Sequence, residues 1–281
     1  MNKTLKISLK IGGVLLGIAL LVVVSGIVWF YFDQQQMFSD PEFDTVAPEL
    51  PPMQRDRAVL VFSKTNGFRH RDGIAGGLVA FEKLTDELEW DMYATENGAV
   101  FNAEQLSRFV AIVWLCTTGP ALTAEQQSAF QGYLENGGGY IGLHSAGDGS
   151  HKDWDWYVKE VIGTPFVGHP INPQFQDAVV TVETPSHPTM NHLPATFSHN
   201  EEWYGFEKSP RRAGLTVLAT VDEKTYEPQY TAMGDDHPVI WVHPQGQGRV
   251  FYSALGHQAS AYDSNDYMQV LSKALLWVSA N

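Results

Sequence analysis

The sequence predicts an α/β fold in which a mainly parallel sheet is flanked by helices. Short apolar runs alternate with helical segments between residues 58 and 143, as expected when strands are joined by right-handed crossover helices. Polar loops rich in glycine, threonine or histidine follow three of these runs. The glycine triplet 137–139 ends one helix and leads into a buried strand, because glycine adopts the left-handed conformation without a Cβ clash. The polar loops should therefore share one edge of the sheet.

Periodicity and capping indicate the elements of the first half. Ile74, Leu78 and Phe81 share one face of a helix. Residues 123–126, Thr-Ala-Glu-Gln, match a capping box, so a second helix should begin there. The expected elements are a strand at 58–62, a helix at 72–88, strands at 90–94 and 110–115, a helix at 123–136 and a strand at 140–143.

The second half is expected to be partly antiparallel. Turns such as residues 244–248, Pro-Gln-Gly-Gln-Gly, connect neighbouring strand segments there. Leu271, Leu275 and Val278 form the buried stripe of a closing helix. The expected elements are a helix at 154–161, strands at 178–182, 215–221, 239–242 and 249–254, and a helix at 267–278.

An uncharged apolar stretch at residues 11–32 predicts one transmembrane helix ahead of the domain. As a helix its residues would extend about 33 Å, enough to cross a bilayer. The stretch ends in an aromatic belt and follows three lysines, Lys3, Lys6 and Lys10. The positive-inside rule then places a cytoplasmic tail at residues 1–10 and the domain outside, in the periplasm or extracellular space. A cleaved signal peptide is the alternative, although its apolar region usually has only about 7–15 residues.

The remaining chain divides into a linker and a domain. Residues 33–57 contain four prolines and lack helical or strand periodicity, which is typical of a linker. The domain is expected at residues 58–281. The net charge of the chain is −14, so the acidic domain should not bind nucleic acid. The single cysteine, Cys116, excludes an intramolecular disulfide and a metal site built from cysteines.

Polar residues cluster after the strand expected at 140–143. His144, Ser145 and Asp148 arrive at its carboxyl end, where open parallel sheets bind ligands. Further histidines fall near other expected strand ends. Imidazole and carboxylate groups together bind divalent metals, and they also form acid–base pairs near neutral pH. The tight His-Glu-x-x-His spacing of many zinc enzymes does not occur in the sequence.

Several motifs occur in order between residues 58 and 281. They are Val-Leu-Val-Phe-Ser-Lys-Thr-x-Gly-Phe-Arg-His at 59–70, the glycine-rich stretch 137–148, Trp-x-Trp-Tyr at 154–157, Phe-x-x-His-Pro at 166–170, Glu-Trp-Tyr at 202–204, Asp-His-Pro at 236–238, and the segment from Gly-Arg-Val-Phe-Tyr at 248–252 to Gly-His at 256–257. With these motifs the region 58–281 resembles the ThuA-like, or trehalose-utilisation, family. The resemblance implies a flavodoxin-like sheet related to class I glutamine amidotransferases, and a role in sugar metabolism.

The amidotransferase relationship does not extend to glutamine hydrolysis. In that superfamily a nucleophilic cysteine occupies the strand-to-helix turn where this chain has His144. An imidazole cannot supply the thiolate that forms a glutaminyl thioester. The late His-x-Glu pair is also missing, because His257 is followed by Gln258 and Ala259. Cys116 is expected to be a small apolar residue at a strand end, and no glutaminase activity is expected.

Aromatic residues in the polar loops suit a sugar ligand, whose C–H face stacks on rings while its hydroxyls accept and donate hydrogen bonds. Some of these rings are expected to belong to the core instead. The candidate substrate-binding residues are Phe68, Arg69, Ser145, Trp154, Trp203 and Tyr204. The candidate catalytic residues are His144, Asp148, Glu202 and Asp236. The candidate ligands of a possible divalent metal are His70, His144, His169 and His257.

The sequence therefore favours a membrane-tethered, sugar-modifying enzyme, a hydrolase or isomerase of trehalose or keto-sugar metabolism, with a possible oxidoreductase partner. The first strand is not followed by Gly-x-Gly-x-x-Gly, so no dinucleotide cofactor is expected. The alternative is a non-catalytic carbohydrate-binding or scaffold subunit. Geometry discriminates the two hypotheses: if His70, His144, His169 and His257 converge, catalysis is favoured, and if they scatter, binding is favoured.

Overall fold

The computed structural model of the protein describes residues 3–280, with side chains from residue 11 onward. Residues 1–2 of the expected tail and residue 281 of the expected domain lie outside the described residues. The chain forms two compact units, residues 1–40 and residues 41–281. Each unit is described by itself.

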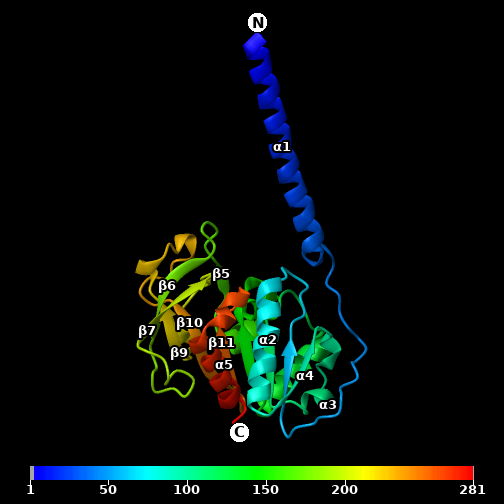
Figure 1. The fold of residues 1–281 in the computed structure, drawn as a ribbon. Helices are drawn as coiled ribbons and strands as arrows, with labels where there is room; N and C mark the ends of the chain where they lie inside the picture. Colours follow the sequence, from blue (N-terminus) through cyan, green and yellow to red (C-terminus); the bar gives the residue numbers. More distant parts are fainter. Residues whose placement is uncertain (1–2, 281) are drawn as a thin grey trace. The chain divides into compact units, whose positions relative to one another are not determined.

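The first unit consists mainly of one long apolar helix, α1 (Lys3–Asp33), followed by the short 3-10 helix η1 (Gln35–Phe38) (Figure 1). Residues Ile11–Asp33 are long and apolar enough to cross a membrane. A signal sequence near an N-terminus can meet the same criterion of length and composition. The helix is thus compatible with a signal anchor or a single-pass span.

The second unit contains a nine-stranded sheet in the order β2-β1-β3-β4-β11-β10-β9-β6-β7. The first five strands of this order are all parallel to one another. The residues of β1, β3 and β4 are buried throughout, as expected for strands covered on both faces. The parallel strands are β1 (Ala58–Phe62), β2 (Asp91–Thr95), β3 (Ala111–Leu115), β4 (Gly139–Leu143) and β11 (Gly248–Ser253).

The other four strands extend the sheet in antiparallel pairs. Four successive reversals separate β7 from β11, so β7 runs in the same direction as the parallel strands. Its carboxyl end therefore lies at the same sheet edge as the carboxyl ends of β1, β3, β4 and β11. The antiparallel strands are β10 (Pro238–Gln245), β9 (Thr216–Val221), β6 (Gln176–Val182) and β7 (Thr196–Glu201); a separate small sheet pairs β5 (Phe166–Gly168) with β8 (Gly205–Phe206).

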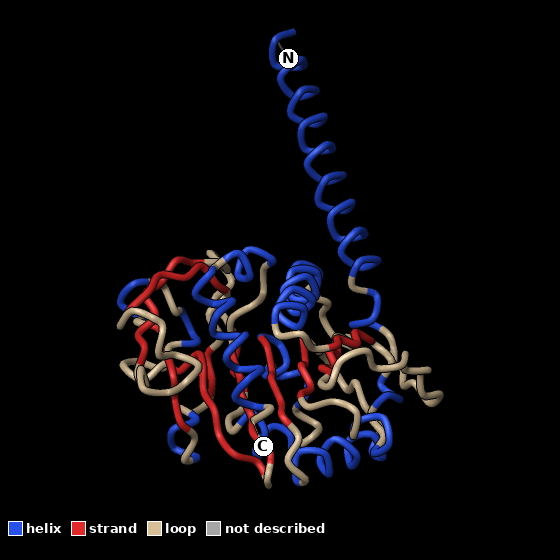
Figure 2. Tube along the Cα trace, turned by 60° about the horizontal axis from the view of Figure 1, so that its bottom comes forward, coloured by secondary structure: helices blue, strands red, loops and turns tan. Residues whose placement is uncertain are grey.

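Helices cover both faces of the parallel strands. On β3, Trp114 stacks on Phe130 of helix α4, whereas the next residue, Leu115, lies against Gly77 of helix α2. Successive side chains of a strand point to opposite faces, so α2 and α4 lie on opposite faces. Figure 1 shows α5 beside α2, and Figure 2 shows the strands in red between the helices in blue. The helices are α2 (Arg71–Glu87), the short α3 (Ala103–Leu106), α4 (Ala124–Glu135) and α5 (Asn265–Val278).

The α/β fold class expected from the sequence is confirmed, and the capping box at Thr123 is present. The helix expected at 154–161 is a short π-helical segment, η5 (Tyr157–Ile162). The sequence did not predict strands β5, β7 and β8 or helix α3. These elements are short or polar: β7, for example, has the sequence Thr-Phe-Ser-His-Asn-Glu and lies at the sheet edge.

Residues 41–57, part of the expected linker 33–57, pack along the domain without forming a helix or strand. The Asp44 carboxylate pairs with the Lys64 ammonium at 2.5 Å. The Gln126 side chain donates to the Asp44 carbonyl at 2.7 Å, and the Gln105 side chain donates to the Pro48 carbonyl at 2.6 Å. The segment is therefore held by side chains of the β1 loop, α3 and α4.

Candidate functional site

Four side chains converge at the sheet edge where the parallel strands end. One potential ligand atom from each of His70, His144, Glu202 and His257 lies within 4.8 Å of the others. His70 precedes α2 and ends the loop that follows β1; His144, Glu202 and His257 lie at or just beyond the ends of β4, β7 and β11. The side chain of His257 is 13% exposed and that of Glu202 is 1% exposed. We call these four residues the His-Glu cluster.

His144 adopts a backbone conformation that residues other than glycine rarely take. Its φ angle is +51°, which places it in the left-handed region at the turn that ends β4. Such strain costs of order 1–3 kcal/mol and concentrates at functional sites. The Tyr252 hydroxyl donates to the His144 carbonyl at 2.8 Å, so the surrounding core holds this turn in place.

The ring of His144 has a fixed orientation. Its Nδ1 lies 2.9 Å from the Ala254 carbonyl, an acceptor, so Nδ1 carries a proton. In the neutral ring Nε2 then presents a lone pair to the cluster. Around this nitrogen lie the Tyr204 hydroxyl at 2.8 Å, His257 Nδ1 at 3.0 Å and Glu202 Oε2 at 3.3 Å.

Glu202 is the anionic centre of the cluster. Its Oε2 lies 3.0 Å from His257 Nδ1. Its Oε1 lies 3.1 Å from His169 Nδ1 and also accepts a hydrogen bond from the Gln174 side chain. Burial alone would raise the pKa of this carboxyl, but the hydrogen bonds with His144 and His257 outweigh it and hold the pKa well below its usual range.

The pKa values of the two most buried histidines of the cluster shift in opposite directions. Burial, together with the charges of His144 and His257, holds the pKa of His70 well below its ordinary value. Its Nδ1 lies 3.2 Å from the Ser145 hydroxyl. Burial also opposes protonation of His144, but the Glu202 and Glu201 carboxylates outweigh it and raise the His144 pKa.

Glu201, which was not among the candidates from the sequence, stabilises the backbone that carries the cluster. Its buried carboxylate accepts the Gly256 backbone N–H at 2.7 Å and the Glu202 backbone N–H at 2.9 Å. It thereby fixes the residue before His257 and the backbone of Glu202. Burial favours the neutral form of Glu201, but its contact with His199 and the charge of His144 lower its pKa. Only its position next to Glu202 could have indicated it in the sequence.

The expected metal ligands and catalytic residues are only partly brought together. His70, His144 and His257 converge, whereas His169 contacts Glu202 from outside the four-residue group. The Asp148 carboxylate accepts the Ser150 backbone N–H at 2.8 Å, and burial raises its pKa. Asp236 pairs with Arg211 at 3.3 Å, with 43% of its side chain exposed. Asp148 and Asp236 thus lie outside the His-Glu cluster, and Glu202 replaces His169 in the set of potential ligands.

Some of the expected substrate-binding residues contact the cluster. Tyr204 and Ser145 bond to His144 and His70, as described, and the Phe68 ring packs edge-on against His70 with ring centres 4.8 Å apart. The Arg69 guanidinium pairs with Glu96 at 2.5 Å. These four side chains either line the cluster or belong to the loop that carries His70.

The two expected tryptophans belong to the core. The buried Trp203 donates its indole N–H to the Gln176 carbonyl at 2.9 Å. The half-buried Trp154 stacks on Tyr157 with ring centres 5.1 Å apart, beside Trp114. The buried Trp203 therefore has no face open to a sugar, whereas Trp154 is held against the core by its stacking on Tyr157.

The structure does not assemble a glutaminase nucleophile. Cys116 ends β3, is buried, and has a φ angle of +50°. Burial, followed by the nearby carboxylates of Glu201 and Asp148, strongly raises the pKa of its thiol. A thiol that stays protonated is a poor nucleophile, so Cys116 cannot replace the cysteine that is absent at position 144.

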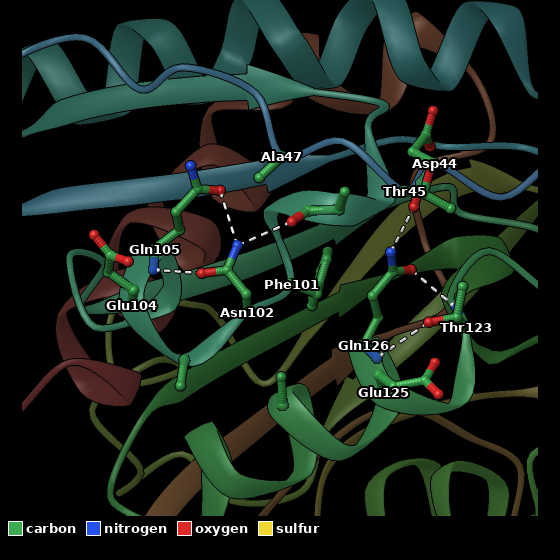
Figure 3. Close-up of a pocket in the computed structure, with 13 residues that line it drawn as sticks. Asp44, Thr45, Ala47, Phe101, Asn102, Glu104, Gln105, Thr123, Glu125 and Gln126 are labelled. Carbon is green, nitrogen blue, oxygen red and sulfur yellow. Dashed lines mark hydrogen bonds between the residues drawn. The ribbon is translucent and has the colours of Figure 1, made fainter.

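A separate groove of about 730 Å³ lies where residues 44–47 pass α3 and α4. Figure 3 shows Gln126 bridging the segment and Thr123, while Asn102 and Gln105 bond to each other on the other side. The residues that line this groove include none of the His-Glu cluster. It is therefore distinct from the candidate functional site.

Comparisons with known proteins identify the family. The family described as trehalose utilisation (ThuA) matches residues 58–278. A ThuA-like protein from Bacteroides uniformis is 25% identical, with a TM-score of 0.69 over 83% of this chain and 95% of that chain. None of the curated proteins matches the chain.

More distant solved structures share the fold alone. A ThuA-like protein from Parabacteroides merdae is 16% identical, with a TM-score of 0.60 over 79% of this chain and 90% of that one. A cytoplasmic protein from Salmonella typhimurium LT2 is 11% identical, with a TM-score of 0.53 over 79% and 99%. With the family match over most of the chain, the conclusion is that this protein belongs to the ThuA, or trehalose-utilisation, family.

Proposed function

We propose that this protein is a sugar-modifying enzyme whose active centre is the His-Glu cluster. The observation that carries the proposal is the convergence of His70, His144, Glu202 and His257 from four separate strand ends. Burying several ionisable groups together costs free energy unless they are paired. Clusters of this kind are common at functional sites. A carbohydrate-binding or scaffold subunit would need hydrogen-bonding and aromatic groups but no such cluster. Membership of the trehalose-utilisation family supports a sugar as the substrate.

The cluster has the groups needed for acid–base chemistry. Glu202 is ionised and contacts His144, His169 and His257. His169 has 33% of its side chain exposed, so it can meet a substrate that approaches from solvent and exchange a proton with it. This arrangement suits hydrolysis or isomerisation of a glucose disaccharide or its keto derivative. A keto-sugar substrate would require an oxidoreductase to produce it.

The function is tested by turnover of sugars by the full-length protein in detergent. Trehalose, sucrose and their keto derivatives are incubated with the wild-type chain and followed by NMR. His144→Gln should reduce turnover at least 100-fold, whereas the surface variant Asp236→Asn should retain it. Sugar binding without turnover in the wild-type protein would favour the scaffold alternative instead.

We also propose that α1 tethers the domain to a membrane, with the N-terminus in the cytoplasm and the domain in the periplasm or outside the cell. Support comes from the apolar helix Ile11–Asp33 and from the three lysines that precede it, Lys3, Lys6 and Lys10. A reporter that is active only in the cytoplasm, fused after Asn281, should give no signal. Signal from this fusion would reverse the proposed orientation.

A further inference from the structure

We infer that His70, His144, His257 and Glu202 together bind one first-row divalent transition-metal ion. The site is the one to which the proposed function assigns catalysis, but the inference concerns metal binding and does not depend on the substrate. The ligand set differs from the four histidines expected from the sequence, because Glu202 takes the place of His169.

The spacing of three of the four ligand atoms fits a metal centre. His144 Nε2 and His257 Nδ1 are 3.0 Å apart, His257 Nδ1 and Glu202 Oε2 are 3.0 Å apart, and His144 Nε2 and Glu202 Oε2 are 3.3 Å apart. Nitrogen and oxygen ligands bound at about 2.0–2.1 Å in a tetrahedron are separated by roughly 3.3 Å. The three atoms thus already have nearly the separations that a shared ion would impose.

Hydrogen bonds account for only part of this arrangement. Because His144 Nδ1 donates to Ala254, Nε2 has one lone pair when neutral or one proton when charged. Three polar atoms nevertheless lie 2.8–3.3 Å from it: the Tyr204 hydroxyl, His257 Nδ1 and Glu202 Oε2. A single lone pair or proton can serve only one of them well. A cation attracts the lone pairs of both imidazoles and the carboxylate at the same time.

Each of three ligands is held by a second contact, as metal ligands commonly are. The Ala254 carbonyl holds Nδ1 of His144, and the Ser145 hydroxyl holds Nδ1 of His70, which leaves the other ring nitrogen of each for the ion. His169 and Gln174 hold Oε1 of Glu202, which leaves Oε2 for the ion.

The donor set selects the class of metal. Three imidazoles and one carboxylate suit Zn²⁺, Mn²⁺, Co²⁺ or Ni²⁺, whereas Mg²⁺ and Ca²⁺ prefer oxygen ligands alone. Against the one negative charge of Glu202, a divalent ion would leave a net positive centre. The His257 and His169 side chains are 13% and 33% exposed, so a sugar oxygen can approach from their side. Such a centre would polarise a carbonyl or hydroxyl oxygen of the substrate.

The test is the metal content of the full-length protein, purified in detergent without a histidine tag. The protein is stripped with a chelator, dialysed separately against micromolar Zn²⁺, Mn²⁺ and Co²⁺, and measured by atomic emission. We expect one ion per chain with a Kd below about 1 μM for at least one of these metals. Binding of less than a tenth of an ion per chain with all three metals would overturn the inference.

Matched variants locate the ion. Glu202→Gln preserves the side-chain shape and should weaken binding at least 100-fold, and His70→Ala and His257→Ala should do the same. His169→Ala should weaken binding less than 100-fold, because His169 acts only through Glu202. His187→Ala, which removes a histidine bonded to Thr189 and not part of the cluster, should have no effect. Near-UV circular dichroism identifies any variant that fails to fold. If the alanine variants fail to fold, Glu202→Gln still tests the site.

The result separates this inference from the proposed function. Unchanged metal binding in folded Glu202→Gln would overturn the metal site. Sugar turnover by protein that binds no metal would also reject the metal inference while supporting the enzyme. Stoichiometric binding lost in the cluster variants, without turnover of any sugar, would support the metal site and count against the enzyme.

Discussion

The parallel and antiparallel halves of the sheet contribute differently to the candidate site. In the parallel half, strands β1 and β4 are buried throughout, and the loops beyond β1, β4 and β11 supply His70, His144 and His257. The antiparallel half is partly exposed, with an alternating burial pattern in β6, and the chain beyond β7 supplies Glu202. The parallel half thus provides the imidazoles, and the antiparallel half provides the carboxylate that contacts two of them, His144 and His257.

The largest expected effect is that of His144→Gln, at the end of a parallel strand. It should reduce both metal affinity and sugar turnover at least 100-fold, because Nε2 lies within 3.3 Å of Glu202 and His257. His144 is fully buried and bonded at both ring nitrogens. Its replacement should also destabilise the fold by about 1–3 kcal/mol, measured by thermal unfolding of the metal-free protein. Full turnover by this variant would show that His144, at the end of a parallel strand, takes no part in the reaction.

The next effect should come from the antiparallel half, through Glu201→Gln. Glu201 holds the backbone of Glu202 and Gly256 but is not itself in the ligand set. We therefore expect metal affinity to fall about 10–100-fold, as is usual when a group that orients a metal ligand is changed. The comparison variant is Glu202→Gln, for which the loss should be larger. Equal losses in the two variants would show that the two glutamates act as one unit.

Tyr204→Phe should have a smaller effect. It removes one hydroxyl, 2.8 Å from His144 Nε2, and leaves the ring in place. A hydrogen bond of this kind contributes about 1 kcal/mol, so metal affinity should change less than tenfold in a titration of the stripped protein. A loss as large as that of Glu202→Gln would make the Tyr204 oxygen a ligand in its own right.

Asp236→Asn should change turnover and metal affinity less than twofold. Asp236 pairs with Arg211 at the surface, and such pairs contribute only about 0–1 kcal/mol to stability. Side-by-side assays of the variant and the wild-type protein check this expectation. A larger loss would restore the catalytic role that the sequence suggested for Asp236.

No glutaminase activity is expected from either half. The Cys116 thiol is buried with a strongly raised pKa, and His144 occupies the place of the nucleophile. Purified protein should release no ammonia from glutamine above background, and the native thiol should not react with a thiol-specific reagent. Ammonia release that disappears in Cys116→Ser would contradict this assignment.

The sequence predicted the parallel half well because its signals are local. Apolar runs, the capping box at Thr123 and the glycines at 137–139 each act within a few residues, and the polar residues at strand ends follow from the topology. His70, His144, His169 and His257 were therefore selected as candidate ligands whose convergence or scatter would discriminate the two hypotheses. The first two and His257 converge in the structure.

The antiparallel half was harder to predict because its contacts are long-range. Nothing local indicates that β7, a polar edge strand, ends at the same sheet edge as β4. Glu202 was selected as a proton acceptor without any indication that it shares a ligand set with the histidines. Gln174 carries no sequence signal at all. His169 was expected among the ligands because residue type alone does not show that it contacts Glu202 and not the other histidines of the set.

X-ray absorption of the zinc-loaded full-length protein tests most directly whether both halves share one metal centre. Three imidazole nitrogens and one carboxylate oxygen should surround the ion at about 2.0–2.1 Å. The Glu202→Gln variant should lose the carboxylate contribution or the ion itself. A spectrum with one imidazole or none, or a spectrum unchanged in Glu202→Gln, would contradict the account.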